Sequence, residues 1–342
     1  MYKEIVRPLL FKMDPEKAHW LAGRVLNATG KLFKVDARAP QAYRCDTLNQ
    51  PQNRHLANRV GLAAGFDKNG HLVGVLGALG FGFAEIGSIT ARPSKGNPKP
   101  RMFRLPEDEA LINRMGLNGE GAEAVCERLM DYERWSLPLG LNIAKTNDPN
   151  IQGDWAIDDI LKSLRRAIDI HQLMYISVNI SCPNTKEGAA TEYKYVHDLV
   201  VEIARLRQSK LSNTPVLLKL SPDSEPEFLK QVIRVANGYG LNGFICGNTT
   251  NKRWLSGYGN LRSAKDEVGG LSGKPLFSQT MEAVKLIDQN RRYDQVLIAC
   301  GGIRTGSDAD YAIKQGADLI QLYTALVYEG PNVVRNIVRG MK

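Results

Sequence analysis

Residues 296–324 read VLIACGGIRTGSDADYAIKQGADLIQLYT. The apolar run at residues 296–300 predicts a buried strand that ends at two glycines. A helix predicted over residues 307–315 then leads to a second apolar strand, at residues 319–322. A strand, a helix and a further strand in so short a stretch are typical of a parallel α/β fold.

The same unit recurs along the chain from residue 59 onward. Short apolar runs predict eight strands, over residues 60–63, 83–87, 137–142, 175–180, 215–220, 243–247, 296–300 and 319–322. Amphipathic segments predict a helix after each strand, over residues 69–79, 120–131, 157–172, 192–208, 225–238, 278–289, 307–315 and 331–340. Eight such units favour a closed (β/α)8 barrel, the TIM barrel fold. An open doubly wound sheet is the alternative, because periodicity does not show whether a sheet closes.

A short segment precedes the barrel. We assign residues 1–40 to a two-helix extension and residues 41–342 to the barrel. Pro8 predicts that the first helix begins near Val6, and Asp14-Pro15 predicts the N-cap and first position of the second. Apolar side chains fall on one face of each helix, namely Tyr2, Ile5, Val6, Leu9, Leu10 and Met13, then Ala18, Leu21, Ala22, Val25 and Leu26. This face could either pack on the barrel or, with a basic rim, meet a membrane surface.

The composition narrows the class of protein. Hydrophobic residues make up 43% and charged residues 24% of the 342 residues, as in a globular chain that can bury a full core. The net charge of +9 leans toward the N-terminus, since the first 38 residues hold eight Lys or Arg against four Asp or Glu. Five cysteines without a C-x-x-C pair argue against a disulfide framework, a zinc site or an iron–sulfur cluster. Basic residues that are not interleaved with aromatic ones argue against nucleic-acid binding, and no apolar run of about 18 residues predicts a transmembrane helix.

Polar or small residues follow all eight predicted strands. The catalytic pocket of a TIM barrel forms at the C-terminal ends of its strands, so these residues are predicted to converge. They are Lys68, Ser88, Asn142, Asn179, Asn184, Lys219, Asn248, Thr249, Gly301, Gly302, Tyr323 and Thr324. The glycine pair, with residues 316–318 and a following helix, is typical of a barrel phosphate site, and a simple tight turn is the alternative.

The stretch NISCPNT at residues 179–185 puts amides, hydroxyls and one thiol directly after a strand. Cys182 could act there as a base or a nucleophile. Amide side chains near the predicted pocket suit a planar ligand rich in donors and acceptors. They belong to Asn113, Asn142, Asn179, Asn184 and Asn248.

Two lysines suggest charged or carbonyl-rich partners. Lys68 lies in AAGFDKNG, residues 63–70, where small residues would let a flat ring approach the backbone and the lysine could neutralise a carboxylate. Lys219 ends an apolar strand, so it needs an anion or a carbonyl-rich ring, such as a reduced flavin, unless it reaches solvent.

An ordered set of motifs resembles one family. The set runs MYKEIVRPLLF (1–11), DPEKAH (14–19), GLAAGFDKNG (61–70), EIGSITARP (85–93), PRMFRL (100–105), LINRMG (111–116), NISCPNT (179–185), GNTT (247–250), GGLSGKPL (269–276), GGI (301–303) and QLYT (321–324). Together these motifs, which span nearly the whole chain, resemble the class 2 dihydroorotate dehydrogenases, the quinone-dependent and membrane-associated type. The chain departs from the pattern in three respects. Class 2 members normally carry serine where this chain has Cys182, and cysteine is the class 1 habit. The loop after Thr185 reads KEGAATEY rather than the usual continuation, and Leu117 and Gly247 replace the commoner Phe and Thr.

The resemblance implies a (β/α)8 barrel that holds FMN, oxidises dihydroorotate to orotate in de novo pyrimidine (UMP) synthesis and passes electrons to a membrane quinone. It further implies a peripheral protein, a monomer, on the cytoplasmic side of the cell (inner) membrane, attached through its N-terminal helices. An FMN barrel oxidoreductase that uses fumarate or NAD, or acts on a related pyrimidine, is the alternative.

The resemblance also implies roles for individual residues. Cys182 would take the C5 proton of the substrate while hydride passes to the flavin. Substrate would contact Lys68, Asn113, Arg114, Met115, Gly116, Leu117, Asn179, Asn184, Asn248 and Thr249. FMN would contact Ala64, Gly65, Phe66, Asp67, Lys68, Ser88, Asn142, Asn179, Lys219, Gly247, Gly273, Gly302, Tyr323 and Thr324. The quinone entrance would lie near His19, Arg104 and Tyr323.

Overall fold

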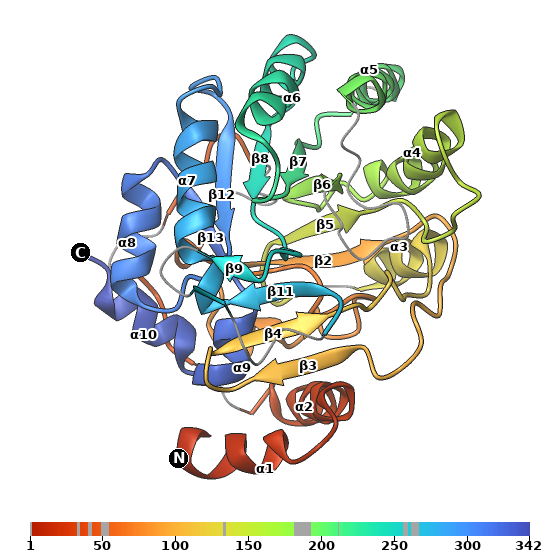
Figure 1. The fold of residues 1–342 in the computed structure, drawn as a ribbon. Helices are drawn as coiled ribbons and strands as arrows, with labels where there is room; N and C mark the ends of the chain where they lie inside the picture. The colour runs from red at the N-terminus through yellow and green to blue at the C-terminus, as the bar shows by residue number, and fades with distance from the viewer. Residues whose placement is uncertain are drawn as a thin grey trace.

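Eight parallel strands close into a barrel in the order β1-β13-β12-β8-β7-β6-β5-β2 (Figure 1). The computed structural model describes residues 2–32, 35–39, 43–48, 55–132, 135–180, 193–210, 212–255, 259–260 and 267–342. The barrel strands are β1 Val60–Leu62, β2 Phe83–Ile89, β5 Leu139–Ile143, β6 Tyr175–Asn179, β7 Val216–Leu220, β8 Gly243–Cys246, β12 Val296–Cys300 and β13 Leu319–Leu322. All eight predicted strands and the predicted TIM barrel are confirmed, and the open-sheet alternative is wrong.

Helices surround the barrel, as the alternating pattern predicts. They are α3 Ala122–Asp131, α4 Asp154–Ile168, α5 Tyr193–Ser209, α6 Pro226–Gly238, α7 Phe277–Asp288, α8 Gly306–Lys314 and α10 Val333–Gly340. The helix predicted over residues 69–79 is wrong, because only a 3-10 turn, η3 Leu76–Leu79, forms there. The Asp67 carboxylate accepts hydrogen bonds from the main-chain N–H groups of His71 and Leu72, at 3.0 and 2.8 Å. A side chain that captures these amides favours turns over a continuous helix.

Apolar side chains fill the end of the barrel opposite the C-terminal strand ends. This cluster includes Phe83, Tyr175, Leu217, Ile245, Ile298 and Leu319. The two aromatic rings fit because glycines face them on neighbouring strands: a Cβ added to Gly61 would lie 2.3 Å from Phe83, and one on Gly140 would lie 2.3 Å from Tyr175. The barrel is therefore a packed core at this end, and within the described residues its interior leaves space for a ligand toward the C-terminal ends of the strands.

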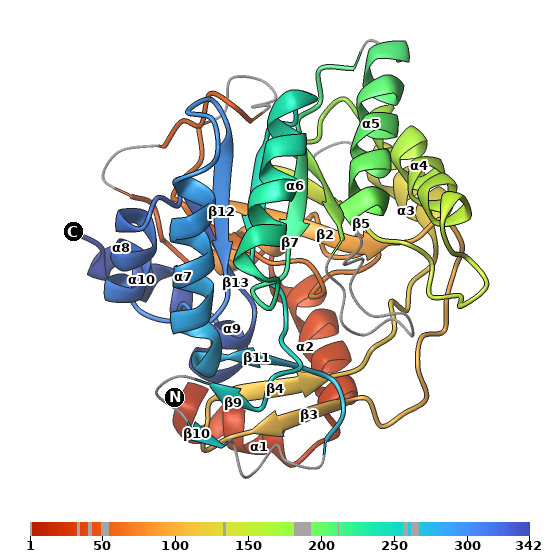
Figure 2. The same cartoon turned by 45° about the horizontal axis from the view of Figure 1, so that its top comes forward.

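The N-terminal extension forms helical turns at one end of the molecule (Figures 1 and 2). A π-helical turn, η1 Tyr2–Val6, leads into α1 Arg7–Phe11, and α2 Pro15–Thr29 follows. Helical structure thus begins earlier than the predicted Val6, while Pro8 does lie in the first turn of α1. Asp14 caps α2 as predicted, since its side chain accepts from the N–H of Lys17 at 3.0 Å.

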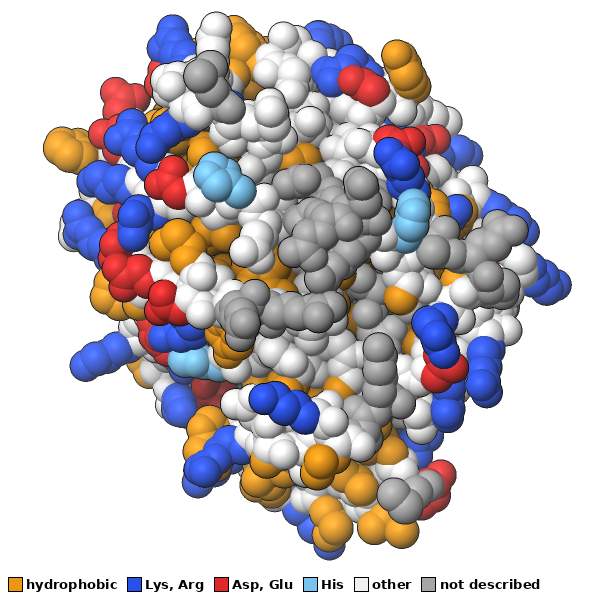
Figure 3. All heavy atoms as spheres, turned by 180° about the vertical axis from the view of Figure 1, so that it is seen from behind, with side chains coloured by type: hydrophobic (Ala, Val, Ile, Leu, Met, Phe, Trp, Pro, Cys, Tyr) orange, Lys and Arg blue, Asp and Glu red, His pale blue; other side chains and the backbone are white. Residues whose placement is uncertain are grey.

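Most apolar side chains of these helices face outward. Leu9 and Trp20 are each 60% exposed, and of the apolar stripe predicted on α2 only Ala18 and Leu26 are buried. The interpretation that this face packs on the barrel is therefore wrong for most of its residues. Figure 3 shows hydrophobic side chains gathered with Lys and Arg at the end of the molecule where these helices lie. Within the described ranges, no helix is both long and apolar enough to span a bilayer.

A small antiparallel sheet that the sequence did not reveal lies beside the N-terminal helices, at the same end of the molecule (Figure 1). Its strands are β3 Met102–Leu105, β4 Ala110–Asn113 and β11 Gly270–Gly273, in the order β11-β4-β3. β3 packs against α2. A short hairpin of β9 Trp254–Leu255 and β10 Gly259–Asn260, a 3-10 turn η5 Lys274–Leu276, and a short helix α9 Thr324–Glu329 complete the fold.

Candidate active site

One cavity of about 740 Å³ opens at the C-terminal ends of the barrel strands, a volume suited to a small-molecule ligand. It extends from the ends of β6, β7 and β8 to α2, which lines it from Glu16 to Asn27. Most of the predicted site residues line it, namely His19, Ala64, Gly65, Phe66, Asp67, Lys68, Ser88, Asn113, Met115, Gly116, Leu117, Asn179, Lys219, Gly247, Asn248, Thr249, Gly273, Gly302, Tyr323 and Thr324. Residues from seven of the eight barrel strands, or from the segments directly after them, therefore converge on one cavity, and β5 is the exception.

Three predicted residues lie elsewhere. The Arg114 guanidinium turns away from the cavity to Glu267, at 2.9 Å, and to the main-chain oxygen of Val268, at 2.8 Å. Arg104 lies behind the cavity wall, where it donates to the main-chain oxygen of Met13 at 2.8 Å. Asn142 is fully buried beneath the cavity floor. Cys182 and Asn184 lie outside the described residues, so their predicted roles stay predictions.

A buried ion pair lies under the cavity floor. The Lys219 ammonium is 3.2 Å from Oε2 of Glu85, and both side chains are buried. Glu85 Oε1 also accepts hydrogen bonds from Asn142, at 2.8 Å, and from Ser177. Burial by itself would raise the pKa of Glu85, but Lys219 and these hydrogen bonds outweigh it and hold the pKa below its ordinary value. Glu85 is therefore an ionised carboxylate that balances the charge of Lys219.

Sequence reasoning missed Glu85. Its signal was a carboxylate inside the otherwise apolar segment FAEIGSI of β2. A second charge in another buried strand, Lys219 in VLLKL of β7, was the natural partner. Because a buried charge has to be paired, these two residues could have been matched from the sequence alone.

Amide side chains form a line across the floor. Asn248 Nδ2 lies 3.4 Å from Asn179 Oδ1, and Asn179 Nδ2 lies 3.5 Å from Ser88 Oγ, so both contacts are long. Ser88 donates in turn to Asn142 Oδ1. Asn142 in turn donates a hydrogen bond to Glu85. This chain of hydrogen bonds fixes the orientation of the amide groups at the cavity floor.

Two further lining residues, Asn118 and Gln321, were missed. Asn118 Oδ1 accepts a hydrogen bond from the Lys68 ammonium at 2.5 Å, so it helps to hold that lysine at the cavity wall. Gln321 donates to the buried Tyr175 hydroxyl at 2.9 Å. Gln321 belongs to the QLYT motif and Asn118 lies two residues after LINRMG, but neither side chain was singled out.

The predicted phosphate site is present only in part. Gly302 lines the cavity with a positive φ of 73°, and a Cβ there would lie 2.5 Å from the backbone of Phe277. Residues 316–318 lie at the opposite end of β13, where Arg291 binds the main-chain oxygen of Gly316 and the Asp318 carboxylate, at 2.8 and 2.5 Å. This part of the predicted site is wrong.

Main-chain N–H groups at the start of α8 already have hydrogen-bond partners within the chain. Its capping box joins Thr305 and Asp308, whose side chains bond each other's main-chain N–H groups, at 3.1 and 2.9 Å. The glycine loop and the start of α9 at Thr324 therefore remain as the parts of the predicted phosphate site that line the cavity.

Comparison with known proteins identifies the family. The family model for dihydroorotate dehydrogenase matches residues 49–342. The chain belongs to the dihydroorotate dehydrogenase family. Proteins named dihydroorotate dehydrogenase (quinone) from Roseiflexus sp. (strain RS-1) and Natronomonas pharaonis are 39% and 40% identical to it, over 98% and 99% of this chain and 92% and 93% of theirs. A crystal structure of DHODH from Eimeria tenella in complex with ferulenol superposes with a TM-score of 0.81 at 30% identity, covering 96% of this chain and 90% of that one.

Dihydroorotate dehydrogenases are flavin-dependent, and the cavity suits a flavin. A flavin ring carries carbonyl acceptors and an N–H donor. Lys219, Asn179 and Asn248 offer donors along the floor. Two oxygens of lining residues, Thr249 Oγ1 and Gln321 Oε1, are buried without a hydrogen-bond partner in the described part of the chain. Because unpaired buried oxygens are costly, a polar ligand that donates to them is favoured here.

The other end of the cavity is aromatic. His19 of α2 places Nε2 2.9 Å from the main-chain oxygen of Phe66, so this nitrogen carries the hydrogen. The His19 ring packs edge-on against Phe66 at 4.8 Å, and Phe66 in turn against Tyr323 at 6.1 Å. Burial raises the pKa of Tyr323 to about 12, which keeps its hydroxyl neutral. The predicted neighbours His19 and Tyr323 are thus both in contact with the Phe66 ring. These three rings connect α2 to the floor of the cavity at the strand ends.

The imidazole of His19, which is only partly exposed, is expected to make the docking of α2 sensitive to acid. Burial lowers the pKa of His19 below its ordinary value of 6.5, although the hydrogen bond to Phe66 acts in the opposite direction. A histidine with a lowered pKa binds its proton more readily after unfolding, so it destabilises the fold once the pH falls below 6.5. We expect the free energy of unfolding, measured with urea at a series of pH values, to fall in that range. His19→Gln, which keeps a donor without titrating, should remove part of the fall, and identical pH profiles would contradict this assignment.

Proposed function

We propose that this chain oxidises dihydroorotate to orotate in de novo pyrimidine (UMP) synthesis, with FMN as its flavin and a membrane quinone as electron acceptor. The observation that carries the proposal is the continuity of the cavity. It holds the amides of Asn179 and Asn248 at one end and His19 of α2 at the other. One cavity can therefore serve a polar substrate on the barrel and an acceptor that arrives beside the N-terminal helices.

The chain's polar side chains match the chemistry of dihydroorotate, an anion whose ring carries both N–H and C=O groups. Lys68 supplies positive charge for the carboxylate, and Asn118 holds its ammonium in place. Asn113, Asn179 and Asn248 supply amides that can donate and accept at once, and Thr249 adds a hydroxyl with an open oxygen. Asn184 joins this set by its place in the motif.

FMN is the flavin that this cavity and the glycine loop favour. When bound, it supplies the hydride acceptor for the reaction. Ala64 and Gly65 leave one wall free of bulky side chains, while Gly273, Gly302 and Thr324 line the region suited to the phosphate. Lys219, held by Glu85, places a fixed positive charge at the floor, where it favours negative charge on a neighbouring ring.

Proton removal from the substrate falls to Cys182. This assignment rests on its place in the NISCPNT motif of the family. A thiol with an ordinary pKa near 8.5 needs less help than a hydroxyl to become a base.

The quinone and membrane parts of the proposal rest on the N-terminal extension. We assign residues 1–40 to membrane association and quinone access and residues 41–342 to the FMN-binding barrel. Exposed apolar side chains such as Leu9 and Trp20, with Lys and Arg around them, suit a protein that lies on an anionic membrane surface. We place the protein, as a monomer, peripherally on the cytoplasmic side of the cell (inner) membrane.

Anaerobic stopped-flow spectroscopy tests the proposal in two steps. Dihydroorotate is expected to bleach the absorbance of the bound flavin, and a short-chain quinone analogue should restore it faster than fumarate or NAD. A flavin that dihydroorotate does not bleach would sink the substrate assignment. Reoxidation by fumarate or NAD but not by the quinone would sink the acceptor assignment alone.

A further inference from the structure

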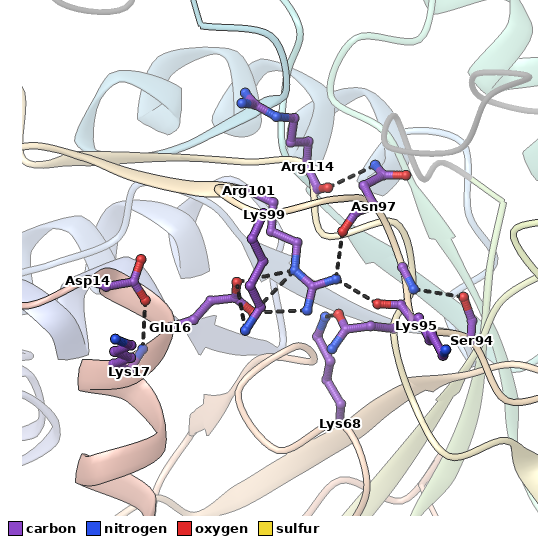
Figure 4. Close-up of polar contacts among 12 residues, drawn as sticks. Asp14, Glu16, Lys17, Lys68, Ser94, Lys95, Asn97, Lys99, Arg101 and Arg114 are labelled. Carbon is purple, nitrogen blue, oxygen red and sulfur yellow. Dashed lines mark hydrogen bonds and ion pairs between the residues drawn. The ribbon is translucent and has the colours of Figure 1, made fainter.

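A buried arginine joins the N-terminal extension to the barrel (Figure 4). The Arg101 side chain is only 7% exposed, and its fork binds the Glu16 carboxylate through Nε, at 3.2 Å to both oxygens, and through Nη2, at 2.9 Å. Its remaining nitrogen, Nη1, donates to the main-chain oxygens of Lys95 and Asn97, at 2.7 and 2.9 Å. One side chain therefore holds both a helix and a loop.

The loop that Arg101 holds is braced against the predicted substrate loop, residues 113–117. The N–H of Asn97 donates to the oxygen of Met115 at 3.1 Å, and its side-chain Nδ2 donates to the oxygen of Arg114 at 2.8 Å. The main-chain oxygen of Arg101 itself accepts from the N–H of Arg114 at 2.9 Å. Met115 lines the cavity directly after these contacts. A shift of Arg101 would therefore be passed on to the cavity wall.

The helix that Arg101 holds is α2, at the other end of the same cavity. Glu16 lies in its first turn, one turn before His19, which is fixed to Phe66. The second cation near Glu16, Lys99, is 3.7 Å away and largely exposed, so it is a weak substitute for Arg101. The Glu16–Arg101 pair is thus the buried polar link between α2 and the substrate loop.

We propose that the Glu16–Arg101 pair couples the two ends of the cavity, so that the position of α2 and the binding of substrate depend on each other. The inference rests on the proposed function, since it assigns dihydroorotate to the loop at residues 113–117 and the acceptor to α2. Glu16 and Arg101 act as positioning residues, through α2 and through the loop contacts of Asn97. Because coupling between two sites is reciprocal, loosening the pair weakens substrate binding, and substrate binding tightens α2.

Glu16→Gln tests the coupling from the acceptor side. The variant keeps the shape of the side chain but removes the charge that Arg101 binds. The dissociation constant for dihydroorotate, taken from the concentration dependence of flavin reduction, is expected to rise at least about 5-fold, the lower end of typical couplings. The reduction rate at saturation is expected to stay within about twofold, since no reacting group has changed. An inactive fraction would lower the amplitude and leave this constant unaffected.

Arg101→Lys tests the same ion pair from the arginine side, and Glu123→Gln is the control. Lysine keeps the charge but not the planar fork, so it cannot bind Glu16 and two carbonyl oxygens together, and the same weakening is expected. Glu123 is a matched control, because it also lies in the first turn of a helix and binds an arginine of another element, Arg166, at 2.6 Å. Its pair is far more exposed than Glu16–Arg101, so Glu123→Gln should leave the dissociation constant unchanged.

Hydrogen exchange tests the reciprocal effect. Orotate is expected to slow exchange of the α2 amides in the wild-type holoenzyme but not in Glu16→Gln. A wild-type dissociation constant in Glu16→Gln, or a change in thermal stability alone, would overturn the coupling. If wild-type flavin is not reduced by dihydroorotate at all, the proposed function fails instead, so the two failures are distinguishable.

Discussion

Cys182→Ala is expected to slow flavin reduction by dihydroorotate about 10²- to 10⁴-fold, the usual contribution of a positioned general base. The thiol is the group of the NISCPNT motif that ionises most readily, and its thiolate can take a proton, while the asparagines of the motif can only donate or accept hydrogen bonds. Substrate binding should change little, because it depends on Lys68 and the amides. Anaerobic stopped-flow measurement of the saturating reduction rate, separated from the dissociation constant, checks both parts.

Two variants serve as controls for Cys182→Ala. Cys182→Ser restores the residue usual in class 2 members, so it is expected to retain activity, with a pH profile that levels off at higher pH than that of the thiol enzyme. Cys300 also places its side chain at the cavity, but burial raises the pKa of that thiol, which makes it a poor base. Undiminished reduction by Cys182→Ala would place the base elsewhere, and a large loss in Cys300→Ala would point to that second thiol.

The barrel was predictable because each of its units is local. An apolar run such as residues 296–300 and the amphipathic helix after it are visible within about 20 residues, and eight repeats of that pattern leave few folds open. The small sheet was not predictable in this way. β4 and β11 are four residues each and pair across most of the barrel sequence, Ala110 with Gly273. No periodicity in either segment shows such a pairing.

The site was predictable where the barrel alone places a residue. Lys68, Asn179 and Thr324 follow strands, and strand ends converge in this fold. The side-chain direction of Arg114 was not predictable, because it depends on Glu267, more than a hundred residues away. The prediction that residues 316–318 bind phosphate was wrong for a similar reason. Arg291, which follows α7, donates a hydrogen bond to the main-chain oxygen of Gly316.

The ion pair beneath the floor leads to the second large effect. Glu85→Gln is expected to lower the free energy of unfolding by about 3–5 kcal/mol, the usual cost of leaving one charge of a buried pair without its partner. Glutamine keeps the shape of the side chain and an oxygen for Asn142 and Ser177, so the change isolates the charge. Urea unfolding followed by tryptophan fluorescence measures the loss. Glu202→Gln, which removes an exposed partner of Arg205, should cost at most about 1 kcal/mol.

The double variant Glu85→Gln/Lys219→Met distinguishes the charge from the packing. If an unpaired Lys219 ammonium causes the loss, removing it as well should recover much of the stability, because two neutral groups of similar shape carry no uncompensated charge. Flavin reduction should not recover, since Lys219 lines the floor of the cavity. The pKa of Glu85 lies below its ordinary value of 4.5, so the pair should persist through mildly acid pH and be lost only as the pH falls through that lowered pKa. A double variant no more stable than Glu85→Gln would mean that the carboxylate acts through its hydrogen bonds to Asn142 and Ser177 rather than through Lys219.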